Sequence, residues 1–197
     1  LGRIATTAQT DQDVETIMEL AQAAGLGTGI VTTSSVTDAT PASFVAHINQ
    51  RYCEGPTGMV QTIAQLRLSV DCSQDYKASG GKGSIAEQIA SSQLDIVLGG
   101  GARYFEQSVE GSLQRTVFDE ARGNGFQVIR TWEELARIPE TGKVLGLFSR
   151  GTMPVQLRGV DGAQAQRVER IEGKVSQPEP FDCEPNPDFE GIPSLAD

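Results

Sequence analysis

Short apolar runs that alternate with helical patterns are the feature that most limits how this chain can fold. Apart from Asp95, the run LDIVLGGG (94–101) is continuously apolar and ends in glycines, as a strand buried on both faces does. A helical pattern with a Ser84–Glu87 capping box precedes it, and further helices and strands take turns through 116–150. This alternation indicates β-α-β units, so we expect an α/β fold with a mostly parallel sheet between helices.

Other stretches carry local predictions. The segment 13–25 places apolar residues on one helical face, with an aspartate as its cap, and 28–36 follows as a buried strand. The stretch 59–68 lies in an ambiguous region and favours a short helix. From about residue 151 the pattern gives way to Gly, Pro and charge, which is typical of surface loops.

The charge balance argues against nucleic acid and anionic lipid as partners. Asp and Glu number 26 against 16 Lys and Arg, a formal net charge of −10, and such a surface repels phosphates. No window approaches about 18 uninterrupted apolar residues, so we expect no membrane span. The N-terminal stretch lacks both an apolar leader region and an initiating Met, which fits a fragment or a processed product.

The cysteines divide into a pair and a single residue. Cys53 and Cys72 bracket a polar segment that a short disulfide loop could close, while Cys183 has no evident partner. An odd cysteine in an exported protein suggests a partner outside the chain. Because the chain has no CxxC spacing and one histidine, His47, we expect no zinc site made from this chain alone.

The stretch VTDATPASFVAHINQR, which begins at residue 36, carries the candidate site chemistry. Thr40 as cap and Pro41 at the first helical position predict a helix that runs to Arg51. Asp38 ends the preceding strand, where open α/β sheets place functional groups, and with Thr40 it offers oxygens that suit magnesium. Arg51 offers a planar fork for phosphate oxygens. A straight helix would separate Asp38 from Arg51 by about 15 Å, so a shared site requires Arg51 to reach back.

Two glycine-rich segments leave a nucleotide-binding alternative open. GGKGS (80–84) resembles a phosphate loop but lacks the GxxxxGK[ST] spacing, and LGGGAR (98–103) follows a strand without forming GxGxxG. A tight turn before a capped helix and a glycine crossing at a strand end explain both segments without a ligand. His47 is likewise explained as a packed residue.

Several long segments together resemble the bacterial alkaline phosphatase family. The segment VTDATPASFVAHINQRYCEGP carries most of the resemblance. Others appear in the family's order: TIMELAQAAGLGTGIV, GGKGSIAEQ, LGGGARYF, VLGLFSRGTMPV and CEPNP. The resemblance implies an alkaline-phosphatase-like sandwich that is incomplete in this chain. Residues 1–197 would then be the central part of a single domain, with 151–197 rich in loops.

The resemblance also implies roles for individual residues. Asp38 and Thr40 fall where the family places its magnesium-site acid and threonine. Arg51 falls where the family places the arginine that grips the substrate phosphate. The family's nucleophilic serine, in an Asp-Ser-Ala stretch, and its zinc ligands have no counterpart here, so we expect no catalytic nucleophile in this chain.

The same resemblance pairs the cysteines. Cys53 and Cys72 match the family's first disulfide, although the loop between them differs in this sequence. Cys183 matches one half of the second disulfide, whose other half would lie beyond residue 197.

The whole enzyme implied by the resemblance is periplasmic or secreted, homodimeric, and hydrolyses phosphate monoesters through a phosphoserine intermediate with zinc and magnesium. This chain would supply at most a partial magnesium site and would need the remainder of the enzyme as its partner. Alone, we expect it to be inactive. A non-catalytic α/β fragment or interaction module is the second hypothesis, and a nucleotide-binding α/β domain is the third.

Overall fold

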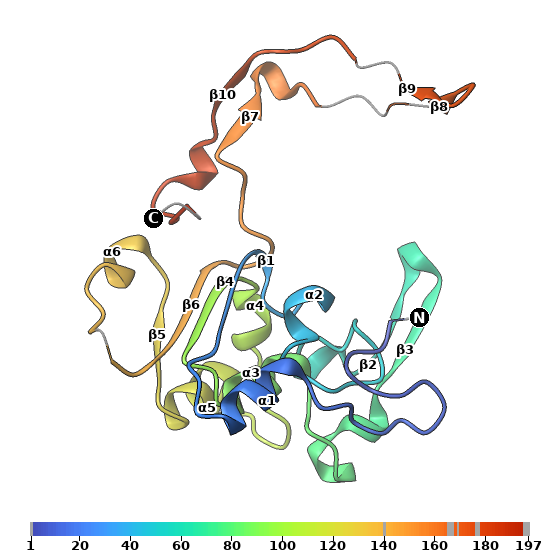
Figure 1. Ribbon diagram of the computed structural model, residues 1–197, viewed down its shortest axis with the longest axis vertical. Helices are drawn as coiled ribbons and strands as arrows, with labels where there is room; N and C mark the ends of the chain where they lie inside the picture. Colours follow the sequence, from blue (N-terminus) through green and yellow to red (C-terminus); the bar gives the residue numbers. More distant parts are fainter. Residues whose placement is uncertain (1, 140, 165–167, 169, 176–177, 195–197) are drawn as a thin grey trace.

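A four-stranded parallel sheet forms the centre of the computed structural model, which describes residues 2–139, 141–164, 168, 170–175 and 178–194 (Figure 1). Its order is β1-β4-β6-β5, and each neighbouring pair is parallel. The strands are β1 (Gly29–Ser35), β4 (Ile96–Gly100), β5 (Phe126–Ile129) and β6 (Lys143–Ser149). Helices flank the sheet, so the α/β class with a mostly parallel sheet is confirmed.

The helices are short, and most begin with reciprocal side-chain caps. A capping box opens α1, α3, α5 and α6, with Thr16, Ser84, Thr116 and Thr131 as the capping residues. The predicted box at Ser84 and Glu87 is therefore present. The helices are α1 (Ile17–Ala23), α2 (Ala39–Ala42), α3 (Ile85–Ser91), α4 (Ala102–Phe105), α5 (Val117–Gly123) and α6 (Trp132–Leu135).

The main core lies where α3 and α5 meet the sheet. α3 packs against α5, and α5 packs against β5. Ile89 of α3, Phe118 of α5, Val97 of β4 and Leu145 of β6 are all buried in one cluster. A close-packed interior of this kind resists deformation, so it holds the strand ends in fixed positions.

The N-terminal helix differs from its prediction. Its cap is Thr16 rather than an aspartate, and it is shorter than the predicted segment 13–25. None of its residues is buried, and Ile17 is 68% exposed. Of the apolar face that predicted this helix, Val14 and Ile17 are thus exposed, and Met18 and Ala21 are half-buried.

The predicted short helix over 59–68 is wrong, because this stretch forms a hairpin. β2 (Val60–Ile63) pairs with β3 (Leu68–Asp71) in antiparallel register. A 3-10 turn joins the strands, and Arg67 after it takes a φ of 49°, in the left-handed region. Cross-strand pairing therefore outweighs the local helical pattern.

Beyond β6 the chain leaves the sheet as a long arm, drawn in orange and red in Figure 1. β7 (Leu157–Gly159) pairs with β10 (Cys183–Pro185), and β8 (Arg170–Ile171) pairs with β9 (Lys174–Val175). The chain then returns, and Gly191 accepts a hydrogen bond from the amide of Trp132. Within the described ranges, no helix is long and apolar enough to cross a membrane. The 3-10 turns are η1 (Pro56–Gly58), η2 (Ala64–Leu66), η3 (Ser73–Asp75), η4 (Lys77–Ser79), η5 (Val160–Gly162) and η6 (Pro187–Phe189).

Candidate functional site

The carboxyl ends of β1, β4 and β6 meet at one edge of the sheet, and glycines allow their close approach. Ser35 pairs with Gly100, which pairs with Ser149. A Cβ atom on Gly100 would collide with the carbonyl of Gly151, and one on Gly101 would collide with the Ser35 hydroxyl. The glycines of LGGGAR therefore have a packing role. They bring the strand ends together at the carboxyl end of the sheet, where parallel sheets place functional groups.

Asp38 lies three positions after Ser35, the last residue of β1, and so at this end of the sheet. It is the N-cap residue of α2, and its backbone carbonyl accepts a 2.9 Å hydrogen bond from Ala42. Its side chain makes no capping bond. The predicted cap at Thr40, with Pro41 first in the helix, is wrong by two positions. The reason is a turn bond from the Asp38 amide to Ser35 (3.0 Å), which starts the helix earlier.

The predicted helix from Pro41 to Arg51 is also wrong, since α2 ends at Ala42. Ile48 instead forms an antiparallel bridge with Ile4, and the amide of each donates to the other's carbonyl at 3.0 Å. The amide of Arg51 donates to the carbonyl of Gly2 at 2.6 Å. Pairing with the N-terminal segment thus overrides the local helical pattern and turns the chain back toward α2.

This return brings Arg51 and Asp38 together. Arg51 Nη2 lies 3.8 Å from Asp38 Oδ1, and the two side chains are 41% and 39% exposed. A separation of this size is an ion pair and not a direct hydrogen bond, so the guanidinium donors stay open to a ligand. The Tyr52 ring lies 5.8 Å from Arg51 Cζ. Arg51, predicted to bind phosphate, and Asp38, predicted to serve the magnesium side, are therefore neighbours.

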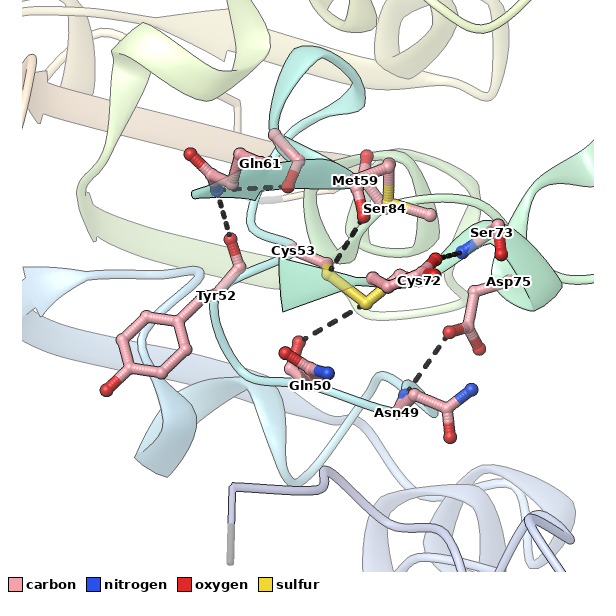
Figure 2. Close-up of a disulfide and its surroundings, with 12 residues drawn as sticks. Asn49, Gln50, Tyr52, Cys53, Met59, Gln61, Cys72, Ser73, Asp75 and Ser84 are labelled. Carbon is pink, nitrogen blue, oxygen red and sulfur yellow. Dashed lines mark hydrogen bonds between the residues drawn. A yellow bond between two sulfur atoms is a disulfide. The ribbon is translucent and has the colours of Figure 1, made fainter. Parts of the chain in front are cut away.

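The backbone after Arg51 is anchored by a disulfide, shown in Figure 2. Cys53 is joined to Cys72, and both residues are fully buried. The carbonyl of Cys53 also accepts a 3.1 Å hydrogen bond from Ile85 at the start of α3. Cys183 is exposed and is bonded to neither of the other cysteines. The disulfide thus ties the segment that carries Arg51 to the end of β3, and the hydrogen bond from Ile85 ties it to α3.

Asp38 and Thr40 carry oxygen side chains two positions apart at the start of α2. Thr40 is exposed, and neither its hydroxyl nor the Asp38 carboxylate makes a hydrogen bond within the described part of the chain. Carboxylate and hydroxyl oxygens, completed by waters, are ligands that Mg²⁺ accepts. Among the described residues, no group of three or more His, Cys, Asp or Glu gathers to hold a metal.

His47 is engaged by the fold on both ring nitrogens. Nδ1 lies 3.0 Å from the Ala5 carbonyl, and Nε2 lies 2.9 Å from the Glu19 carboxylate. Its side chain is only 3% exposed. Burial alone would raise the pKa of Glu19, but hydrogen bonds from Thr16 and His47 outweigh it, so the pKa lies below its ordinary value. His47 is a packed residue and offers no free nitrogen to a metal.

A partly buried polar network at the same end of the sheet has no counterpart in the sequence-based predictions. Thr37 donates to Glu54 Oε2 (2.5 Å), and the Tyr104 hydroxyl donates to Glu54 Oε1 (2.7 Å). The Ser35 hydroxyl lies 2.7 Å from Thr37 Oγ1, and Arg103 donates to the Tyr104 oxygen at 2.5 Å. These partners of Glu54 lie 17 and 50 positions away, so no local pattern marks this residue.

Electrostatics fix the proton in this network. Burial raises the pKa of Tyr104 most, and the hydrogen bond to Glu54 and its negative charge raise it further, against the opposing charge of Arg103. Tyr104 is therefore a neutral donor around neutral pH, and Glu54 is the acceptor.

The GGKGS segment has a structural explanation. A Cβ atom on Gly81 would collide with the backbone of Asp75, and Gly83 takes a φ of 81°. Ser84 and Glu87 then cap α3. These contacts account for the glycines without a bound phosphate.

Comparison with known proteins gives a consistent result. The chain matches the alkaline phosphatase family over residues 2–197. Streptomycin-6-phosphate phosphatase of Streptomyces griseus is 42% identical over 164 residues, which cover 82% of this chain and 34% of that protein. The alkaline phosphatase of Escherichia coli strain K12 is 36% identical over 192 residues, which cover 94% of this chain and 37% of that protein.

A solved structure agrees with these relatives. The alkaline phosphatase from the Antarctic bacterium TAB5 superposes with a TM-score of 0.54 and 28% identity, over 78% of this chain and 36% of that one. A mutant of that enzyme was solved with Mg bound in the M3 site. This chain spans about a third of the length of the curated relatives it matches. Because the family match covers nearly the whole sequence and the parallel sheet is shared, the chain belongs to the alkaline phosphatase family.

Proposed function

We propose that these residues are the central part of a single alkaline phosphatase domain, with 151–197 as its loop-rich portion. The parent enzyme hydrolyses phosphate monoesters through a phosphoserine intermediate. The phosphatase relatives support this reaction class. In this proposal the nucleophilic serine and the zinc ligands come from parts of the enzyme outside this chain.

The observation that carries the proposal is the exposed pair formed by Arg51 and Asp38, 3.8 Å apart at the carboxyl edge of the sheet. A guanidinium binds two phosphate oxygens in one plane, which orients the phosphorus and balances the charge that grows as the ester bond breaks. Arg51 performs this task. Asp38 beside it keeps the guanidinium oriented and limits its swing when substrate is absent.

Asp38 and Thr40 serve the magnesium side, directly or through bound waters. Metal ions held in the complete enzyme supply Lewis acidity and lower the pKa of the attacking oxygen. The Mg-bound structure of the TAB5 mutant supports magnesium as a cofactor, and zinc follows from the family chemistry. His47 takes no part in this, since both of its ring nitrogens are hydrogen-bonded within the fold.

The enzyme is periplasmic or secreted and works as a homodimer in this proposal. The disulfide between Cys53 and Cys72 supports an oxidising compartment. The net charge of −10 supports small phosphate esters rather than nucleic acid or membrane surfaces as partners.

Substitution of Arg51 in the full-length enzyme tests the proposal. Arg51→Ala should lower kcat/KM and weaken inhibition by inorganic phosphate, because one charge-assisted contact to phosphate is lost. The expected loss is about 1.5 to 3 kcal/mol, roughly 10- to 150-fold. Arg51→Lys should recover only part of this, since an ammonium cannot reproduce the planar fork. The melting temperature should stay nearly unchanged, because the Arg51 side chain is 41% exposed.

Arg122→Ala is the matched control. Arg122 is also exposed and pairs with an aspartate, Asp119, at 3.1 Å. It lies at the end of α5, just before β5 begins and so at the opposite edge of the sheet. This variant should keep wild-type kcat/KM and phosphate inhibition. If Arg51→Ala instead lowers the melting temperature and leaves both kinetic constants intact, Arg51 is a structural residue and the proposed site is wrong.

A further inference from the structure

The separation of Asp38 and Arg51 needs a cause other than their own attraction. Both side chains are partly exposed, and an exposed pair 3.8 Å apart is weak in water. The two residues also lie on different segments, one after β1 and the other before the disulfide at Cys53. The bridge between Ile4 and Ile48 turns the Arg51 segment back toward α2, and a direct contact between the two segments is needed to fix their separation.

Glu54 supplies such a contact. It stands three positions after Arg51, and its Oε2 accepts a 2.5 Å hydrogen bond from Thr37, the residue directly before Asp38. Thr37 is fully buried and Glu54 is half-buried, so this bond is partly shielded from water. The amide of Ala86 donates to the carbonyl of Glu54 at 2.9 Å, which fixes the Glu54 backbone to α3.

The other carboxylate oxygen ties Glu54 to a third segment. Oε1 accepts from the hydroxyl of Tyr104, on α4 just beyond β4. Thr37 gives its single hydroxyl proton to Glu54, so the Ser35 hydroxyl at the end of β1 has to donate to Thr37. Every hydroxyl proton along this path is thus used once, and both carboxylate oxygens of Glu54 are occupied. The network leaves Glu54 a single well-defined position.

We propose that Glu54 is a positioning residue that sets the separation of Asp38 and Arg51. It thereby places the phosphate-binding guanidinium of Arg51 relative to the residues on the magnesium side. The inference rests on the roles proposed above for Arg51 and Asp38. Glu54 itself touches neither substrate nor metal. The carboxylate of Glu54 faces Thr37 and Tyr104. Glu54 acts on Arg51 through the backbone of the segment that both residues share.

The test compares single and double variants of the full-length enzyme, with inorganic phosphate as the competitive inhibitor. Glu54→Gln keeps the side-chain shape but replaces one acceptor by a donor. The inhibition constant for phosphate should rise about tenfold, as is usual when a residue that orients a binding group is changed. Added to Arg51→Ala, the same change should raise the inhibition constant no further, because the group that it positions is already absent.

Thr37→Val provides a second route, since it removes only the hydroxyl that binds Glu54. It should weaken phosphate inhibition in the same direction and also be non-additive with Arg51→Ala. If Glu54→Gln yields no folded enzyme, Thr37→Val decides the question by itself.

Glu87→Gln is the control for a purely structural acid. Like Glu54, Glu87 is held by several contacts, which it makes with Ser84 and Lys77. Unlike Glu54, it belongs to the cap of α3. This variant should lower the melting temperature and leave the phosphate inhibition constant unchanged.

The outcomes separate the two claims. If Arg51→Ala leaves phosphate inhibition unchanged, the proposed role of Arg51 fails first. If Arg51→Ala weakens inhibition while Glu54→Gln and Thr37→Val do not, the positioning role of Glu54 is refuted. That role is also refuted if the Glu54 effect persists at full size in the Arg51→Ala background, because Glu54 would then act independently of Arg51.

Discussion

Glu87 shows how this fold stabilises a charge inside its core. Its side chain is 1% exposed, and its Oε1 lies 3.2 Å from Lys77 Nζ. The amides of Ser84 and Glu110 donate to its two oxygens at 2.9 and 3.1 Å. Burial by itself raises the pKa of Glu87, but these hydrogen bonds and the Lys77 charge outweigh it and hold the pKa below the ordinary value of 4.5.

This shift makes stability depend on pH. A carboxyl with a lowered pKa contributes stability that is fully present above pH 4.5 and is lost as pH falls through the folded-state value. Glu87→Gln should lower the free energy of unfolding at neutral pH by about 1 to 3 kcal/mol and should flatten its decline below pH 4.5. Urea unfolding across this pH range measures both effects.

Glu15→Gln is the control for this prediction, because Glu15 is exposed and makes no side-chain hydrogen bond within the described part of the chain. It should leave the unfolding free energy nearly unchanged. A Glu87→Gln variant with the wild-type pH profile would show that Glu87 does not carry the acid-sensitive stability.

Among the elements, the β2–β3 hairpin depends on the disulfide for its attachment. The hairpin lies within the 19-position separation between Cys53 and Cys72, and most of its β2 side chains are exposed. Apolar burial therefore contributes little to holding β2. Closing a loop of this size restricts the unfolded chain, which stabilises the folded state by about 3 kcal/mol in the chain-entropy model.

Replacing both Cys53 and Cys72 by Ser should accordingly lower the unfolding free energy by about 3 kcal/mol. Reduction of the wild-type protein should have a similar effect, whereas the double variant should be insensitive to reductant. Alkylation of the unreduced 197-residue chain, followed by mass spectrometry, should label the exposed Cys183 and neither of the paired residues. Labelling of Cys53 or Cys72 without reductant would contradict the pairing.

Among the elements, the sequence predicts those strands and helix starts that depend on residues close together in the chain. β4 and β6 are apolar along their length because the sheet is covered, and Ser84 with Glu87 marks a helix start within four residues. The helix expected to reach Arg51 fails because Ile48 pairs with Ile4, and no local window contains both residues. Contacts between distant segments decide such cases, and periodicity does not report them.

Only some features of the candidate site could likewise be predicted from local sequence patterns. The position of Asp38 shortly after a strand could be read from the sequence, because the carboxyl ends of parallel strands locate functional groups. The predicted burial of that strand is wrong, since β1 is an edge strand and Val31 is 61% exposed. The closeness of Asp38 to Arg51 could not be read from the sequence, since it depends on the bridge between Ile4 and Ile48. Glu54 could not be predicted for the same reason, because its partners Thr37 and Tyr104 become neighbours only when the carboxyl ends of β1 and β4 lie side by side.

For the whole molecule, exposed apolar surface agrees with the proposal that this chain is one part of a larger enzyme. Ile17 and Leu20 of α1 are 68% and 53% exposed, and Val31 on β1 is 61% exposed. β1 forms an edge of the described sheet, and the chain covers about a third of its curated relatives. Apolar surface beside an open strand edge suits contact with further protein, so we expect the remainder of the enzyme to cover it.

If this chain is one part of a larger enzyme, then the 197-residue chain purified alone should have no sustained turnover on a phosphate monoester such as p-nitrophenyl phosphate. Added zinc and magnesium should not change this, because the single histidine is buried and hydrogen-bonded and the family's serine stretch is absent from the chain. In the proposed site Arg51 would bind the phosphate group, but neither Arg51 nor Asp38 is a nucleophile that could attack the phosphorus. The full-length enzyme under the same conditions is the positive control. Activity that stays with the purified chain and disappears in its Arg51→Ala variant would show that the chain contains a complete catalytic site, and the proposal that it is one part of a larger enzyme would be wrong.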